Sequence, residues 1–155
     1  MAESWQTRLL RWRFNFFPAY RRTGARVTYI AHDWREVHIK LPFDWRTRNY
    51  VGTIFGGSIY AAVDPVYMVM FIKLLGLEYI VWDKAAAIQF KNPGRSELRA
   101  TFRVEDSELQ AIREELRAKD RIDRVYRVEL IDQENNICAL VEKTIHFRRK
   151  NGGQV

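Results

Sequence analysis

The stretch NYVGTIFGGSIYAAVD, residues 49–64, combines a glycine pair with a single carboxylate in an otherwise apolar run. Gly56 and Gly57 open that run, and glycines at the start of a helix let a ligand approach its unpaired backbone N–H groups. Asp64 follows further along, and a lone acid in an apolar helix is costly unless it is paired or used. The stretch therefore predicts an electrophile-binding helix end and a candidate base.

A long central helix must position both groups. The run from Gly56 to Leu75 is apolar nearly all round, with Pro65 predicting a kink and Gly76 a C-cap. The run is also long enough to cross a bilayer. It contains Asp64, Pro65 and Lys73, however, which a lone span tolerates poorly. We therefore expect a buried core helix and no integral membrane span.

Alternating apolar patterns predict six strands around this helix. Two strands precede it and four follow, with a short amphipathic helix over 107–119 whose start reads as a capping box of Ser107 and Gln110. This order predicts an α+β fold, with one antiparallel sheet of about six strands curled around the central helix. The expected strands contain residues 27–31, 37–41, 86–90, 98–104, 126–130 and 137–147.

An additional helix is predicted over residues 5–17, ended by Pro18. Its aromatic stripe comprises Trp5, Leu9, Trp12 and Phe16, and the segment from Ser4 to His32 has six arginines and no acid. In one interpretation the helix packs on the domain by its aromatic side, and its arginines are solvated. In the other the helix is a binding surface for phosphates or anionic lipid. We expect the first.

Length and composition indicate one globular domain of 155 residues. We divide it into an N-terminal helical extension (1–24), a core (25–148) and a basic tail (149–155). The net charge of +7 favours anionic partners without choosing among them. Cys138 is the only cysteine, so no internal disulfide forms, and we expect a buried thiol and a cytoplasmic protein. The three histidines show no metal-ligand spacing, so no metal is expected.

A long apolar helix wrapped by an antiparallel sheet resembles the hotdog fold. The pattern Asn49-x-x-Gly52-x-x-Phe55-Gly56-Gly57, followed by Asp64, resembles the motif of phenylacetyl-CoA-type hotdog acyl-CoA thioesterases. More closely, the chain resembles a divergent thioesterase-like branch of hotdog proteins, a domain of unknown function. The resemblance spans about residues 25–148. Phe55 departs from the motif, because the thioesterases usually have histidine there.

The resemblance implies thioester hydrolysis. Gly57 would donate its N–H to the thioester carbonyl, Asp64 would act as general base or nucleophile, and Asn49 would orient the water or the loop. Gly57 and Asp64 are separated by a helical rise of about 10 Å, too far for one thioester carbon to touch both. The site would therefore combine Gly57 of one subunit with Asp64 of another, which requires a homo-oligomer, a dimer or a dimer of dimers.

Substrate-binding residues follow from the same resemblance. Coenzyme A enters only as part of the substrate, with no separate cofactor. Its phosphates would meet basic residues at strand ends, its carbonyl the motif residues, and its acyl group the central helix. The candidates are Lys91, Arg95 and Arg148 for phosphates, Phe55, Gly56 and Ser58 around the carbonyl, and Tyr60, Tyr67 and Met68 for the acyl group.

Each candidate also has a structural interpretation. Asp64 can balance a buried polar group at the kink, the glycine pair can serve close packing, and Asn49 can make an Asx turn. The basic residues can form a solvated rim, and the residues along the helix can be core.

Three other functions compete with acyl-CoA hydrolysis. A non-catalytic hotdog protein would bind acyl-CoA or lipid, with Phe55 marking the lost catalysis. A hydratase or dehydratase would need a histidine near the helix start, where this chain has none. A nucleic-acid-binding module lacks any recognisable docking motif, so no nucleic-acid partner is expected.

Overall fold

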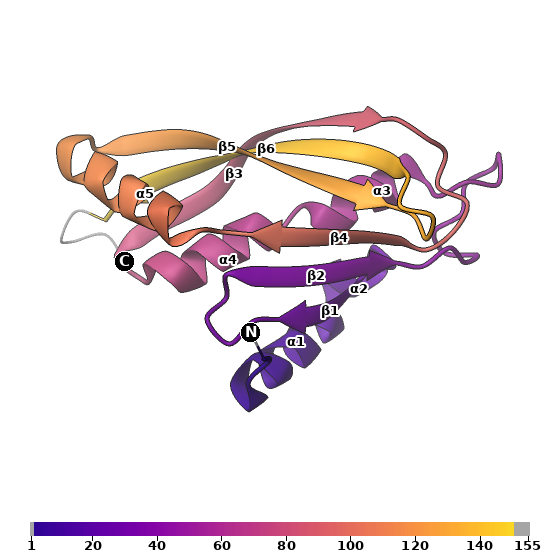
Figure 1. The fold of residues 1–155 in the computed structure, drawn as a ribbon, viewed down its shortest axis with the longest axis horizontal. Helices are drawn as coiled ribbons and strands as arrows, with labels where there is room; N and C mark the ends of the chain where they lie inside the picture. Colours follow the sequence, from indigo (N-terminus) through magenta and orange to yellow (C-terminus); the bar gives the residue numbers. More distant parts are fainter. Residues whose placement is uncertain (1, 151–155) are drawn as a thin grey trace.

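The computed structural model describes residues 2–150 and contains one six-stranded antiparallel sheet in the order β1-β2-β4-β5-β6-β3 (Figure 1). The central helix lies against one face of this sheet, which confirms the predicted α+β architecture. Residues 151–155 of the predicted basic tail lie outside the described residues. The strands are β1 Arg26–Ile30, β2 Glu36–Leu41, β3 Tyr79–Phe90, β4 Leu98–Arg103, β5 Arg121–Ile131 and β6 Ile137–Arg149.

The central helix is interrupted in the middle, at the place where Pro65 predicts a kink. It consists of α3 (Gly56–Val63) and α4 (Val66–Leu75), and Gly76 follows with a φ of 88°. Pro65 has no N–H to donate to the preceding turn, so the regular hydrogen-bond ladder breaks beside Asp64. By length and composition this helix qualifies as a membrane span, but it packs against the sheet through buried residues of α4 that include Met70 and Phe71.

Two local predictions are wrong in detail. In β1 the alternation breaks at a bulge between Val27 and Tyr29, so Ile30 is buried and Tyr29 is not. Helix α5 (Asp106–Ala118) buries its predicted stripe, but its N-cap is Glu105 and it has no capping box. Ser107 is the second residue of the helix, so it does not occupy the N-cap position.

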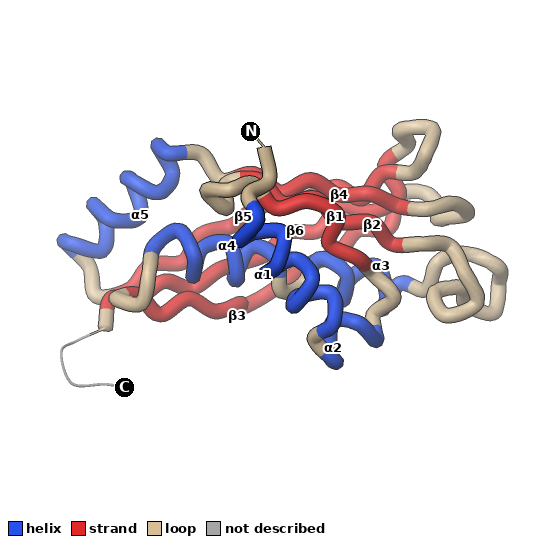
Figure 2. Tube along the Cα trace, turned by 90° about the horizontal axis from the view of Figure 1, so that it is seen from below, coloured by secondary structure: helices blue, strands red, loops and turns tan. Residues whose placement is uncertain are grey.

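Two short helices precede the sheet. Helix α1 (Trp5–Phe16) ends where predicted, and Pro18 then begins a second helix, α2 (Pro18–Arg22). Figure 2 shows both helices on the same side of the sheet as the central helix. The Tyr20 hydroxyl joins α2 to the central helix by donating to the carbonyl of Ala62 at 3.1 Å.

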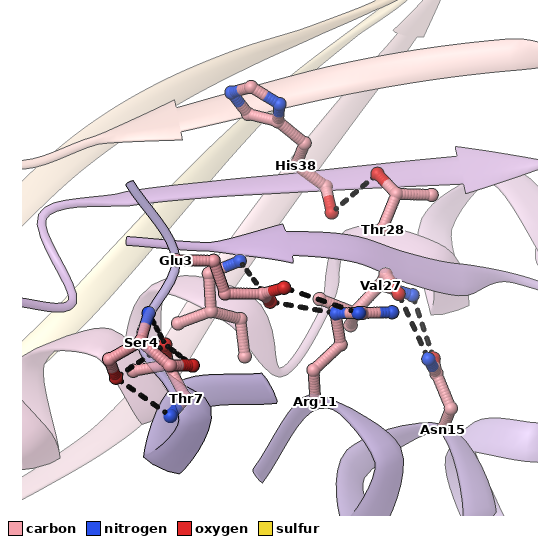
Figure 3. A network of polar contacts seen from close by, with 9 residues as sticks. Glu3, Ser4, Thr7, Arg11, Asn15, Val27, Thr28 and His38 are labelled. Carbon is pink, nitrogen blue, oxygen red and sulfur yellow. Dashed lines mark hydrogen bonds and ion pairs between the residues drawn. The ribbon is translucent and has the colours of Figure 1, made fainter. Parts of the chain in front are cut away.

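Helix α1 is attached to β1 by its polar side (Figure 3). The Asn15 side chain accepts from the backbone N–H of Val27 at 2.8 Å and donates to its carbonyl at 2.9 Å. Arg11 makes two hydrogen bonds to the Glu3 carboxylate, at 2.8 and 3.2 Å. These contacts fix which face of α1 points inward.

The aromatic stripe of α1 points to solvent, so the expectation that it packs on the domain is wrong. Trp5, Leu9, Trp12 and Phe16 are 74%, 54%, 54% and 57% exposed. The inward face instead carries buried Thr7 and half-buried residues such as Phe14. Tertiary partners on β1 accept the polar side of this helix, which a helical periodicity alone does not reveal.

Strand β3 forms one edge of the sheet. It pairs with β6 on one side only, along Tyr79–Phe90, and its other side has no partner strand among the described residues. Ala85, Ala86 and Ala87 are exposed in this strand. A long, weakly charged open edge is a template for another strand.

Candidate active site

An open groove of about 690 Å³ lies between the N-terminal helices and the central helix. Its walls are mostly apolar, and Asp64 is the only acid among the described residues that line it. Its lining includes Leu10, Phe14 and Phe17 on one side and Tyr60, Ala61, Asp64, Met68 and Val69 on the other, with Arg13 and Lys73 also present. The groove therefore presents one carboxylate to a space suited to an apolar ligand.

The Asp64 carboxylate has one oxygen held and one free. Its Oδ1 accepts from the Tyr60 hydroxyl at 2.7 Å and from Lys143 Nζ at 2.5 Å. Its Oδ2 has no hydrogen-bond partner within residues 2–150, and the side chain is 43% exposed. Asp64 is therefore oriented through one oxygen and available to a ligand or water through the other.

Lys143 on β6 lies beneath Asp64 and is fully buried. Its Nζ is also 3.1 Å from Asp83 Oδ1 and 3.3 Å from the Tyr60 hydroxyl. Asp83 Oδ1 has this ion-pair contact but no aligned hydrogen bond within the described chain. One buried cation thus serves two carboxylates, which leaves the cluster one negative charge in excess when all three groups are ionised.

The pKa values in this cluster follow from burial and pairing. Burial by itself lowers the pKa of Lys143, but the Asp64 and Asp83 carboxylates outweigh it, and the net pKa lies above the ordinary 10.5. Burial raises the pKa of the Asp83 carboxyl above 3.8, partly offset by Lys143. Burial also raises the pKa of the Tyr60 hydroxyl, with the hydrogen bond to Asp64 adding to it. Lys143 therefore stays charged.

Sheet register brings Asp83 and Lys143 to the same face. Asp83 is opposite Ile145, which lies two residues after Lys143 on β6. The strand β6 was predicted, but Lys143 was not recognised as part of the site. The sequence contains an indication of this role, because Lys143 lies between Val141 and Ile145 in the set of every second residue that forms the buried face of that strand.

The glycine end of the central helix carries free donors. The backbone N–H groups of Gly56, Gly57 and Ser58 have no hydrogen-bond partner in the part of the chain that the structure describes. Aromatic rings lie against the glycines. A Cβ on Gly57 would be 2.4 Å from the Phe55 ring, and one on Gly56 would be 2.8 Å from the Phe90 ring. The absence of side chains at Gly56 and Gly57 therefore lets the Phe90 and Phe55 rings pack against the backbone, and the N–H groups of both glycines remain unpaired within the described residues.

The glycine end and the acid do not share a cavity in one protomer. Gly56 lines a different hollow, of about 420 Å³, together with Asn49, Phe90 and Lys91. The Asn49 side chain accepts from the backbone N–H groups of Val51 and Thr53 at 3.1 and 3.0 Å, so it holds its own loop as an Asx turn.

The candidate acyl-binding residues separate into two groups. Tyr60 and Met68 line the groove. Tyr67 does not, because it is buried in the core with its hydroxyl donating to the Arg127 carbonyl at 3.2 Å. Burial raises the pKa of Tyr67 to about 12. The prediction that Tyr67 lines the pocket is therefore wrong: the sheet covers the face of the helix that carries it.

The candidate phosphate-binding residues lie at opposite ends of one strand pair. Lys91 follows the end of β3 and Arg95 is exposed in the next turn, whereas Arg148 on β6 pairs with Ile80 near the start of β3. At about 3.3 Å per residue, Lys91 and Arg148 are roughly 35 Å apart. One protomer does not bring them together. Among the described residues no group of three or more His, Cys, Asp or Glu side chains is arranged to hold a metal ion.

Comparison with known proteins agrees with the fold. A family model described as a domain of unknown function (DUF4442) matches residues 6–147. No curated protein sequence matches the chain.

Solved structures match over nearly the whole chain. A Pseudomonas aeruginosa protein of unknown function, PA5026, described as a probable thioesterase, has a TM-score of 0.84 and 16% identity, covering 93% of this chain and 96% of its own. Thioesterase HI1161 from Haemophilus influenzae has a TM-score of 0.70 and 14% identity, with 98% and 97% covered. The PaaI protein from the E. coli phenylacetic acid degradation operon has a TM-score of 0.64 and 16% identity, covering 96% of this chain and 94% of its own.

The predicted hotdog fold and the resemblance to a divergent, thioesterase-like branch of unknown function are thereby confirmed. At these identities the likeness shows the fold, and the activity must be argued from the site itself.

Proposed function

Because this chain belongs to the DUF4442 family of domains of unknown function, we propose that it is a hotdog thioesterase that hydrolyses acyl-CoA at an interface between two subunits. The observation that supports this most directly is the state of Asp64. Its carboxylate is held through Oδ1 and has a free Oδ2 in an apolar groove. An ionised carboxylate in that position can act as a general base.

The reaction begins with water attacking the thioester carbonyl carbon. Asp64 Oδ2 accepts the proton of that water as the new C–O bond forms. The C–S bond then breaks, and the departing thiolate takes the proton from Asp64, which yields the carboxylic acid and the coenzyme A thiol. Lys143 and Tyr60 hold the carboxylate in place through their hydrogen bonds to Oδ1.

The developing oxyanion needs a hydrogen-bond donor aimed at it, such as an unpaired backbone N–H. The N–H of Gly57, which has no hydrogen-bond partner within the described residues, is such a donor, but Gly57 does not line the groove that holds Asp64 of the same protomer. We therefore place Gly57 of a second copy beside Asp64 of the first. The open β3 edge is the contact through which two copies would join, with their β3 strands antiparallel. Lys91 and Arg95, near the glycine end, then supply charges for the coenzyme A phosphates.

A non-catalytic acyl-CoA-binding protein is the second candidate. Phe55 stands where the resembling thioesterases have histidine, and its ring lies against Gly57. A ring in that position narrows access to the N–H donors and removes a polar group from the motif.

Hydrolysis of a panel of acyl-CoAs, followed with a thiol-trapping dye, tests the proposal. We expect turnover by the wild type and at least a hundredfold loss in Asp64→Asn, with acyl-CoA binding retained by calorimetry. Asp120→Asn is the matched control, because Asp120 is exposed and has no polar contact within the described residues. Equal turnover in Asp64→Asn would remove Asp64 from the mechanism. Binding by the wild type without turnover would favour the second candidate.

A further inference from the structure

The outward face of α1 combines aromatic side chains with unpaired arginines. Trp5, Leu9, Trp12 and Phe16 recur at the spacing of one helical face and are more than half exposed. The rings of Trp12 and Phe16 stack at 5.6 Å. Over 12 residues the helix presents an apolar strip about 18 Å long. Isolated exposed apolar residues are ordinary, but a continuous strip marks a contact surface.

Cationic side chains border this strip. Arg8 and Arg13 are exposed, and they lie on opposite sides of the strip at 100° per residue. Neither arginine has an ion pair within residues 2–150, and neither do Arg21 and Arg22 on α2. An interfacial helix has this composition, with tryptophan and phenylalanine on one face and arginine at the margin.

A basic pocket adjoins the same strip. A hollow of about 400 Å³ is lined by Trp12 and Phe16, by four cationic side chains and by no acid. Two of the cations are already paired, Arg11 with Glu3 and Lys40 with Glu97. Arg21 and Arg26 have no carboxylate partner in the described chain, and the Arg21 guanidinium lies 5.9 Å from the Phe16 ring centre. The pocket suits a phosphate at the base of the apolar strip.

We propose that α1, α2 and this basic pocket form a docking surface for a membrane that contains anionic phospholipid. The apolar strip enters the boundary between headgroups and acyl chains, and Arg21 and Arg26 receive lipid phosphates. A second copy of the chain is a poorer occupant, because a self-complementary contact here would set arginines against arginines with no acid to pair them. This inference goes beyond the proposed function and does not depend on it.

The polar inner face of α1 supports this assignment. Asn15 is hydrogen-bonded to both backbone groups of Val27 (Figure 3). Tyr20 on α2 donates to the Ala62 carbonyl of the central helix. The helix is therefore held on the domain without using its aromatic strip. In Figure 2 no other element covers its outer side.

Vesicle flotation with the full chain tests the proposal. We expect wild-type protein to float with phosphatidylcholine vesicles containing 30 mol% phosphatidylglycerol. Binding to pure phosphatidylcholine should be at least about tenfold weaker, as should binding at high salt. Trp5→Ser/Trp12→Ser and Arg21→Gln/Arg26→Gln should each reduce binding about tenfold.

Two control variants match these changes elsewhere on the surface. Trp45→Ser removes a tryptophan that is 82% exposed in a loop. Arg117→Gln/Arg121→Gln removes two exposed arginines, on α5 and β5, that form no ion pair within the described residues. Both should float like wild type, and circular dichroism should show that every variant is folded.

Four outcomes would overturn the proposal. The first is that wild-type protein does not float with anionic vesicles. The second is that Trp5→Ser/Trp12→Ser floats as well as wild type. Sedimentation showing that this variant loses an oligomer, without any vesicle binding by wild type, would make the strip a subunit contact. Binding of inorganic phosphate at the basic pocket without binding of vesicles would make it a soluble-anion site.

Discussion

Lys143 Nζ lies 2.5 Å from Asp64 Oδ1, with the lysine side chain fully buried and the aspartate 43% exposed. The two charges therefore have different surroundings. Water and ligand reach the carboxylate from the groove, whereas the ammonium group is buried and has Asp64, Asp83 and Tyr60 as its polar partners among the described residues. This asymmetry makes Lys143 a positioning residue for Asp64.

Replacing Lys143 should destabilise the protein. Lys143→Met leaves the Asp64 and Asp83 carboxylates without their shared cation, and we expect the free energy of unfolding to fall by about 3 kcal/mol. Urea unfolding at neutral pH measures this loss. Lys84→Met is the control, because Lys84 pairs with Asp123 at an exposed position. Its loss should be much smaller. Similar losses in both variants would contradict the proposed role of the cluster.

The stability of the cluster should depend on pH through Asp83. Its pKa in the folded protein lies above the ordinary 3.8. Between pH 3.8 and the folded pKa, the native state therefore binds a proton that the unfolded chain does not. The contribution of Asp83 to stability therefore rises as the pH falls through its folded pKa, and this rise is absent in Asp83→Asn. The unfolding free energy of wild type relative to Asp83→Asn should increase as the pH is lowered from 7 to 3.8.

Asp123 provides a control of opposite sign for this experiment. Hydrogen bonds from Lys84 and His146 hold the pKa of Asp123 below 3.8. Wild type should lose stability relative to Asp123→Asn only as the pH falls from 3.8 through that lower pKa. A difference between wild type and Asp83→Asn that stays constant with pH would show that Asp83 is not linked to folding.

A charge on the open sheet edge should weaken the proposed dimer. Ala87 is exposed on β3 opposite Glu142, so Ala87→Lys fits the single protomer while setting like charges against each other at a β3–β3 contact. Sedimentation should show an increase of about tenfold in the dimer dissociation constant, and thioesterase activity should fall with the dimer fraction. Thr101→Lys, on the interior strand β4, should change neither. A wild type that is monomeric yet active would refute the shared site.

Local chemistry explains which parts of the fold were predictable. Pro18 and Pro65 lack a backbone N–H, and Gly76 takes a φ of 88°, so each marks a helix end or bend wherever it occurs. The alternation of Leu98, Ala100 and Phe102 likewise identifies one buried face of β4. Strand boundaries were predicted less accurately, since β3 begins at Tyr79, seven residues before the expected strand of residues 86–90.

The candidate site was predictable only in part. Asp64 was singled out from its apolar surroundings, and the structure places it in a groove with Tyr60 and Met68. The role expected of Tyr67 as a lining residue failed because helical neighbours face different partners, and the sheet covers that side. Lys143 was overlooked because its meaning depends on residues far away in the chain.

By itself the sequence determined the order of the six strands, of α1, the central helix and α5, the interruption beside Asp64 and the concentration of arginine near the N-terminus. These properties depend on backbone freedom, side-chain periodicity and charge over a few residues. Only the tertiary structure decided that Asp64, Asp83 and Lys143 meet, and that the aromatic side of α1 faces outward. The meeting of Asp83 and Lys143 depends on strand register, and the orientation of α1 depends on hydrogen bonds such as that between Asn15 and Val27. Both kinds of contact join segments that are far apart in the sequence, and a local sequence pattern does not show which distant segments will meet.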